Sequence, residues 1–254
     1  MFSRAGKYPA VGLFSVTHII SIFICFILIG LAAYVARKMK KETYFKLLKI
    51  FAIVLTCLEV FKIIWNWCLG YKSVDNWLPL YFCSIFIYSL WFAVSKNDKI
   101  RSLGLGFIAM GAGVAGAVFI ISPSTSFSTY PIFHFQCMYS MLYHSTMVYS
   151  SIMLFVTKAY KINLKAVGDY CLFCLIFMTL ALIVNLHTGG NMMFFNTPSG
   201  IPLPVLFKVY NLSSGLFTFV MILAHLSLGF MVWGVCALVE KIRNQILTKR
   251  KKVL

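Results

Sequence analysis

Seven long apolar runs divide the chain, and short polar or charged segments separate them. A helix of about 20 residues crosses a bilayer core of about 30 Å, so each run is long enough for one crossing. The runs lie at residues 11–36, 45–69, 77–94, 100–121, 133–157, 166–187 and 210–239. The pattern predicts an all-α fold, a polytopic bundle of seven transmembrane helices in a single domain over residues 1–254.

Lysine and arginine gather in alternate connections between these runs. The basic residues after the first, third and fifth runs and at the C-terminus are Arg37, Lys38, Lys40, Lys41, Lys96, Lys99, Arg101, Lys158, Lys161, Lys165, Lys249, Arg250, Lys251 and Lys252. The other connections hold few charges, chiefly Lys72, Asp75 and Lys208. Because cytoplasmic loops carry the excess of basic residues, we expect the N-terminus outside, the C-terminus in the cytoplasm and a basic cytoplasmic tail at residues 240–254.

Composition supports this class. The chain is 61% hydrophobic and 11% charged, whereas a soluble domain averages about 45–50% apolar and about 25% charged residues. The net charge of +17 would suggest nucleic acid in a soluble protein, but here the basic residues flank apolar runs. We therefore expect an integral protein of the cell membrane that does not bind nucleic acid.

Ionisable side chains cost about 2.5 to 3.5 kcal/mol each inside a bilayer, so each one there is a candidate functional residue. The candidates are His18, Glu59, Lys62, His144 and His225, with His134 and His187 at the membrane edge. Glu59 and Lys62 lie three residues apart, so they share a helix face and can neutralise each other. We interpret this pair either as a structural ion pair or as a contact for a lipid head group, and His225 as a core or cavity histidine.

Two further patterns concern packing and the loops. In the fourth run, the pairs Ala109/Gly113 and Ala112/Gly116 are small residues four apart, which allow helices to approach closely in a membrane. Residues 188–208 are apolar, uncharged and rich in Gly and Pro. Non-helical chain at membrane depth is tolerated where it is buried in protein, so we expect a re-entrant or capping segment on the outer side. An interfacial loop is the alternative.

Cys83 lies at the head of the third run, in WLPLYFCSIF. It is either a packing residue or a nucleophile that needs a base such as His144 to favour the thiolate. With the predicted topology, Cys83 shares the outer half of the membrane with His18, Glu59, Lys62 and Asn185. Asn185 and Asn191 are candidate donors to an oxyanion, and His187 could add a hydrogen bond. Cys171 and Cys174 form a C-x-x-C pair without a second pair at zinc-site spacing, which favours packing.

The L-P-L-x-x-C segment at residues 78–83, His18, His144 and the stretch NLHTGGNMMFF at residues 185–195 occur in this order along the chain. Together they resemble the bacterial YwaF-like integral membrane proteins, which are relatives of the animal transmembrane protein 164 family. The resemblance implies lipid acyl transfer by a cysteine and a histidine, matched here by Cys83 and His144. Bacterial members commonly have a histidine at the position of Tyr81, so this chain departs from that pattern.

These features lead to three hypotheses. The first is a cofactor-independent acyltransferase or lipid hydrolase that forms a thioester on Cys83. Its substrate is a membrane phospholipid, lysolipid or lipoprotein at the outer leaflet, and the resemblance implies a bacterial membrane. No metal and no cofactor is expected, since no phosphate-binding glycine loop or zinc motif occurs. The second is a non-enzymatic carrier or channel that uses Glu59, Lys62 and the histidines. The third is a structural or regulatory membrane protein.

Overall fold

The computed structural model describes residues 2–201 and 203–253, with side chains as far as residue 248. Its α-helices are α1 (Val16–Val35), α2 (Lys41–Cys68), α3 (Phe86–Ala93), α4 (Asp98–Phe107), α5 (Gly113–Ile121), α6 (Phe135–Val156), α7 (Leu164–Thr188), α8 (Pro204–Leu212) and α9 (Ser214–Val253). Shorter helical turns are η1 (Val74–Asn76), the π-helical η2 (Ile108–Ala112) and η3 (Met192–Phe194). No strand occurs in this part of the chain, so the predicted all-α class is confirmed.

Four of the described helical stretches are long and apolar enough to cross a membrane. They are Val16–Val35, Asp98–Ile121, Leu164–Thr188 and Ser214–Thr248, which correspond to four of the seven predicted runs. The chain is thus a multi-pass membrane protein. Helices α2, of 28 residues, and α6, of 22 residues, are also long enough but are more polar: α2 includes lysine and glutamate at six positions, and α6 is rich in Ser, Tyr and Thr.

The prediction of one continuous helix over residues 77–94 is wrong. Only Phe86–Ala93 is α-helical; residues 78–81 are irregular and residues 82–85 form turns. Pro79 has no N–H group for a helical hydrogen bond. The N–H of Phe86 then bonds the carbonyl of Cys83, at 3.1 Å, rather than a carbonyl four residues back. Cys83 therefore precedes the helix instead of lying within its first turns.

The small residues of the fourth run pack against α6, as predicted. A Cβ atom at Gly113 would lie 2.6 Å from Ser151 Oγ, and one at Gly116 would lie 2.7 Å from the backbone oxygen of His144. Real Cβ atoms do not approach other atoms so closely, so α5 and α6 can touch only because these positions are glycine. This close approach fixes the height of His144 relative to α5.

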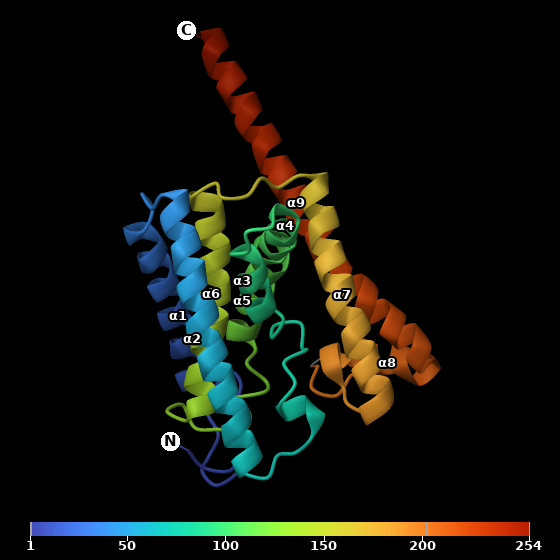
Figure 1. The fold of residues 1–254 in the computed structure, drawn as a ribbon. Helices are drawn as coiled ribbons and strands as arrows, with labels where there is room; N and C mark the ends of the chain where they lie inside the picture. Colours follow the sequence, from blue (N-terminus) through green and yellow to red (C-terminus); the bar gives the residue numbers. More distant parts are fainter. Residues whose placement is uncertain (1, 202, 254) are drawn as a thin grey trace.

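The helices form two groups with α4, η2 and α5 between them (Figure 1). Helices α1 and α2 pack on α6, while α8 and α7 pack on α9, and α4 packs on α7. The N-terminus and α8 lie at one end of the bundle, and α9 projects from the other end (Figure 1). The expected basic tail begins inside α9, which continues as a helix to Val253. Residue 254 and the side chains of 249–253 lie outside the described residues.

The segment predicted to cap the outer side, 188–208, contains the turn η3 and the start of α8. Met192, Met193 and Phe195 are fully buried, whereas Leu203, Val205 and Phe207 are exposed, so the middle of the segment packs into the protein. Met193 and Phe194 have positive φ angles of 55° and 57°, a conformation that non-glycine residues adopt at some energetic cost. The buried side chains and the network described below hold this backbone in place.

Candidate functional site

Cys83 lies in the turn before α3, partly exposed and packed against the main core cluster. The phenolic hydroxyl of Tyr143, from α6, donates to the backbone oxygens of Cys83 at 3.0 Å and Ser84 at 3.1 Å. Tyr143 is itself only 4% exposed. The turn that carries Cys83 is therefore tied to the helix that carries His144.

His144 is buried in α6, with its ring stacked on Phe119 of α5 at 3.5 Å between ring centroids. Its Nδ1 lies 2.7 Å from the carbonyl oxygen of Ser140 and must donate, because a carbonyl only accepts. In the neutral ring, Nε2 is then the unprotonated nitrogen. Nε2 is buried and has no hydrogen-bond partner among the described residues. A lone pair on Nε2 is what a general base requires.

Cys83 and His144 are neighbours through Tyr143 rather than by direct contact. Tyr143 precedes His144, and their rings lie 5.3 Å apart. Within residues 2–201 and 203–253 no hydrogen bond joins Cys83 to an imidazole. Proton transfer between the two side chains would require a rearrangement that brings Sγ and Nε2 together.

His18 forms hydrogen bonds with other residues and none with Cys83 or His144. It is fully buried at the start of α1, where Nδ1 accepts the N–H of Phe14 at 2.8 Å. Its Nε2 then donates to the carbonyl of Ile120, at the end of α5, at 3.4 Å. Both nitrogens are used, so His18 joins α1 to α5 and has no lone pair available for a substrate.

His225 and His187 differ in their surroundings. His187 is exposed on the last turn of α7. His225, on α9, donates from Nδ1 to the carbonyl of Met221 at 2.6 Å, and its ring lies 4.6 Å from that of Phe82. Among the described residues its Nε2 makes no hydrogen bond. The structure thus places a second imidazole, that of His225, against Phe82, the residue before Cys83. The sequence had suggested His225 only as a core or cavity residue.

The predicted ion pair between Glu59 and Lys62 is present, at 2.6 Å between Oε1 and Nζ. Tyr139 of α6 donates to the other carboxylate oxygen, Oε2, at 2.5 Å. Glu59 is 6% exposed, so its charge is balanced by two partners inside the bundle. Tyr139 and Tyr143 lie one turn apart on α6, and that face contacts both Glu59 and the Cys83 turn.

On the other side of Cys83, Asp75 joins two segments that are distant in the sequence. Its Oδ1 accepts the hydroxyl of Tyr81 at 3.1 Å and the N–H of Asn191 at 2.9 Å. The Tyr81 ring also packs on Phe194, at 5.4 Å between centroids. The sequence did not single out Asp75 as a site residue. Its one signal was an acidic group in an outer connection with almost no other charge.

The side-chain amides of the two asparagines predicted as oxyanion donors form hydrogen bonds with residues of the capping segment. Asn185 donates from Nδ2 to the carbonyl of Met192 at 3.1 Å. Asn191 donates from Nδ2 to the backbone and hydroxyl oxygens of Thr197, both at 3.0 Å, and accepts the N–H groups of Asn196 and Thr197 at Oδ1. Both amides hold the segment in shape and are not directed at Cys83 by any hydrogen bond.

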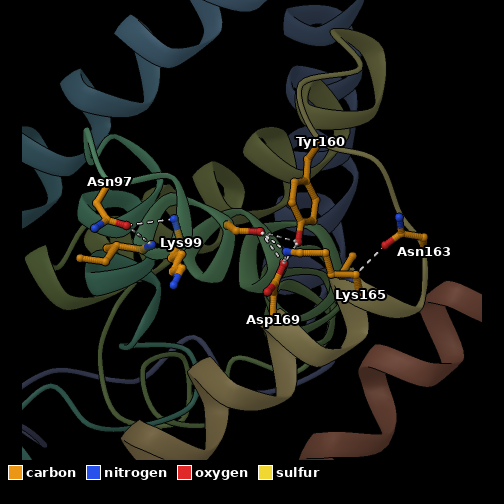
Figure 2. A network of polar contacts seen from close by, with 9 residues as sticks. Asn97, Lys99, Tyr160, Asn163, Lys165 and Asp169 are labelled. Carbon is orange, nitrogen blue, oxygen red and sulfur yellow. Dashed lines mark hydrogen bonds and ion pairs between the residues drawn. The ribbon is translucent and has the colours of Figure 1, made fainter.

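A second polar network lies at the other end of α7 (Figure 2). Asp169 accepts from the Tyr160 hydroxyl at 2.7 Å, from Lys165 Nζ at 2.9 Å and from the Ser102 hydroxyl. Burial raises the pKa of Tyr160 above its usual value, so the phenol remains a donor at neutral pH. Asp169 and Asn185 are about 24 Å apart along α7 at about 1.5 Å per residue. This network therefore joins α4, α7 and the connection before α7, away from Cys83.

Within the described residues, no three His, Cys, Asp or Glu side chains converge as metal ligands. A family model described as the TMEM164 family matches residues 13–229. The match includes Cys83, His144 and the whole capping segment and stops before the basic tail. No curated protein and no solved structure matches the chain.

Proposed function

The chain belongs to the TMEM164 family, and from this premise we propose that it is a membrane-embedded lipid acyltransferase. Cys83 is the nucleophile and His144 the base. The observation that carries the proposal is the buried Nε2 of His144, which has no hydrogen-bond partner among the described residues. His144 directly follows Tyr143, whose hydroxyl bonds the Cys83 backbone. The YwaF-like motifs support the same assignment. The substrates are membrane phospholipids, lysolipids or lipoproteins at the outer leaflet.

The reaction proceeds in two halves. His144 Nε2 takes the thiol proton while Cys83 Sγ attacks the ester carbonyl carbon of the donor, and the carbonyl electron pair moves to oxygen. When the C–O bond breaks, the leaving alkoxide receives the proton and a thioester remains. In the second half, the acceptor hydroxyl gives its proton to His144 and attacks the thioester. Cys83 leaves as thiolate and recovers the proton. No cofactor is consumed.

The matched test compares two partly exposed cysteines that pack on the same core cluster, Cys83 and Cys171. Purified Cys83→Ala should lose acyl transfer between lipids and the acyl-thioester adduct, whereas Cys171→Ala should retain both. His144→Gln should slow both halves. Full transfer by Cys83→Ala would overturn the nucleophile assignment. Solute flux in liposomes that Glu59→Gln abolishes and Cys83→Ala spares would favour a carrier instead.

We also propose seven passes through the cell membrane of a bacterium, with the N-terminus outside and the C-terminus in the cytoplasm. Helices α1, α2, α4 with α5, α6, α7 and α9 make six passes, and residues 77–93 make the seventh. Support comes from the basic connections before α2, α4 and α7, which positive-inside sorting keeps in the cytoplasm.

Thiol labelling tests this orientation. With the exposed Cys57 and Cys68 changed to serine, Lys72→Cys should react with a membrane-impermeant maleimide in intact cells. Lys99→Cys should react only after permeabilisation. The reverse pattern would invert the topology, and labelling of both positions in intact cells would show that the chain does not separate them across the membrane.

A further inference from the structure

Acyl transfer needs a donor for the negative oxygen that forms during attack, and the asparagines expected to provide it are engaged elsewhere. The side-chain amides of Asn185 and Asn191 form hydrogen bonds with the capping segment, mainly with its backbone. Withdrawing them would leave the backbone N–H groups of Met192, Asn196 and Thr197 without these acceptors, which is costly away from water. A donor to the oxyanion must therefore come from another residue.

Tyr143 has the position and the chemistry for this role. Its hydroxyl lies 3.0 Å from the backbone oxygen of the same residue that bears the attacking sulfur. A single hydroxyl hydrogen is shared between this oxygen and that of Ser84, at 3.1 Å, so neither bond has the hydrogen to itself. A phenol carries its proton at neutral pH, and hydrogen bonds to a charged oxygen are about twice as strong as bonds to a neutral one. When this hydrogen turns away, both carbonyls keep a backbone donor, because the N–H of Phe86 bonds the Cys83 oxygen at 3.1 Å and the N–H of Ile87 bonds the Ser84 oxygen at 3.3 Å. A developing oxyanion would therefore compete well for the hydrogen.

The rest of the α6 face keeps the phenol in place. The Tyr143 ring packs edge-on against Phe86, the first residue of α3, at 5.8 Å between centroids. One turn earlier, Tyr139 is anchored to Glu59. Tyr143 is almost fully buried, so its ring is held in place. Rotation of the hydroxyl hydrogen about the C–O bond is enough to redirect the hydrogen bond. Such a preorganised donor lowers the cost of charge development in a dry site.

We propose that Tyr143 donates the hydrogen bond that stabilises the oxyanion during acyl transfer to and from Cys83. This inference rests on the proposed acyltransferase function and adds a catalytic residue to it. As Sγ bonds to the ester carbon, the carbonyl pair moves onto oxygen, and the Tyr143 hydrogen turns from the backbone oxygens to that atom. When the C–O bond breaks, the carbonyl re-forms and the hydrogen returns.

The test uses two buried tyrosines that each donate to a backbone carbonyl on a neighbouring element. Tyr44 donates to Ser150 at 2.8 Å and is fully buried. Tyr143→Phe should lower kcat for acyl transfer by about 100-fold to 1000-fold, the range for removing one oxyanion donor, with KM unchanged. Tyr44→Phe removes an equivalent hydrogen bond and should leave kcat within about threefold.

A second measurement separates stabilisation of the oxyanion from positioning of the thiol. Alkylation of Cys83 by iodoacetamide, followed by mass spectrometry of its peptide, displaces iodide at a tetrahedral carbon and forms no oxyanion. Its rate should therefore be the same in wild type and Tyr143→Phe. If alkylation slows in parallel with transfer, Tyr143 positions the thiol and the proposed role is wrong. Unchanged kcat in Tyr143→Phe would also reject it.

The control Cys83→Ala distinguishes failure of this inference from failure of the proposed function. If Cys83→Ala is inactive while Tyr143→Phe is fully active, the acyltransferase assignment stands and the oxyanion role of Tyr143 falls. If Cys83→Ala transfers acyl groups normally, both assignments fail together.

Discussion

The side-chain amide of Asn185 bonds both backbone groups of Met192. Its Nδ2 donates to the Met192 carbonyl at 3.1 Å, and its Oδ1 accepts the Met192 N–H at 2.8 Å. The next two residues, Met193 and Phe194, have positive φ angles. An amide near the end of α7 thus substitutes for a backbone partner at the point where the capping segment turns into an unfavourable conformation.

Asn185→Ala should therefore destabilise the protein. It leaves the buried N–H of Met192 unpaired and the Met192 carbonyl with the N–H of Phe195 as its remaining donor, which lowers the free energy of unfolding by about 1 to 3 kcal/mol. Denaturant unfolding in detergent micelles measures this. Asn211→Ala, at an exposed position of α8, is the control and should change the value by less than about 0.5 kcal/mol. Equal effects of the two variants would mean that the Asn185 amide does not hold the segment.

The contact between α5 and α6 predicts opposite effects for two glycines. At Gly116 a Cβ would meet the His144 oxygen at 2.7 Å and Met147 Cβ at 3.0 Å, whereas nothing lies within 4 Å at Gly30 on α1. Gly116→Ala should cost about 1 to 3 kcal/mol through overpacking. Gly30→Ala should be neutral or stabilise by up to about 1 kcal/mol, because alanine favours helix. Thermal unfolding of the two variants in one detergent compares them, and an unaffected Gly116→Ala would contradict the close approach.

The sequence predicted those features that depend on neighbouring residues. Small residues four apart indicated the α5 face, and a three-residue spacing indicated the Glu59–Lys62 pair, because one helix alone sets both relationships. The run at 77–94 was predicted wrongly because apolar character reports burial and not conformation. The turns at 82–85 are held partly by Tyr143, and a residue that lies about 60 positions away leaves no local signal.

The candidate site was predictable to the same extent. Cys83 and His144 could be selected as chemical groups, but the amide engagement of Asn185 and Asn191 and the full pairing of His18 depend on tertiary contacts. Asp75 was missed for this reason, since its partner Asn191 lies 116 residues further along the chain. The lone pair on His144 Nε2 follows from a bond within α6, to the carbonyl four residues earlier, but the absence of a partner for Nε2 depends on tertiary packing, such as the stack of the ring on Phe119 of α5.

The network around Asp169 predicts a large effect for the acid and a small one for its lysine. Asp169 has a side chain only 16% exposed and accepts three hydrogen bonds, whereas the Lys165 side chain is 73% exposed. Asp169→Ala should lower the free energy of unfolding by about 1 to 3 kcal/mol, since Tyr160 and Ser102 lose their acceptor. Lys165→Ala should cost less than about 1 kcal/mol, as exposed ion pairs do. Denaturant unfolding measures both, and a larger loss for Lys165→Ala would show that the pair itself, rather than the network, stabilises this end.

The ion pair between Glu59 and Lys62 should respond unequally to removal of either partner. The Glu59 side chain is 8% exposed and that of Lys62 is 21% exposed. Lys62→Met leaves a buried carboxylate with Tyr139 as its remaining donor and should cost about 3 to 5 kcal/mol. Glu59→Gln should cost only about 1 to 2 kcal/mol, because the lysine can extend its amine toward the surface. The double variant should recover most of the loss in Lys62→Met, since no unpaired carboxylate remains. Additive losses in this double-mutant cycle would mean that the two charges do not stabilise each other in the bundle.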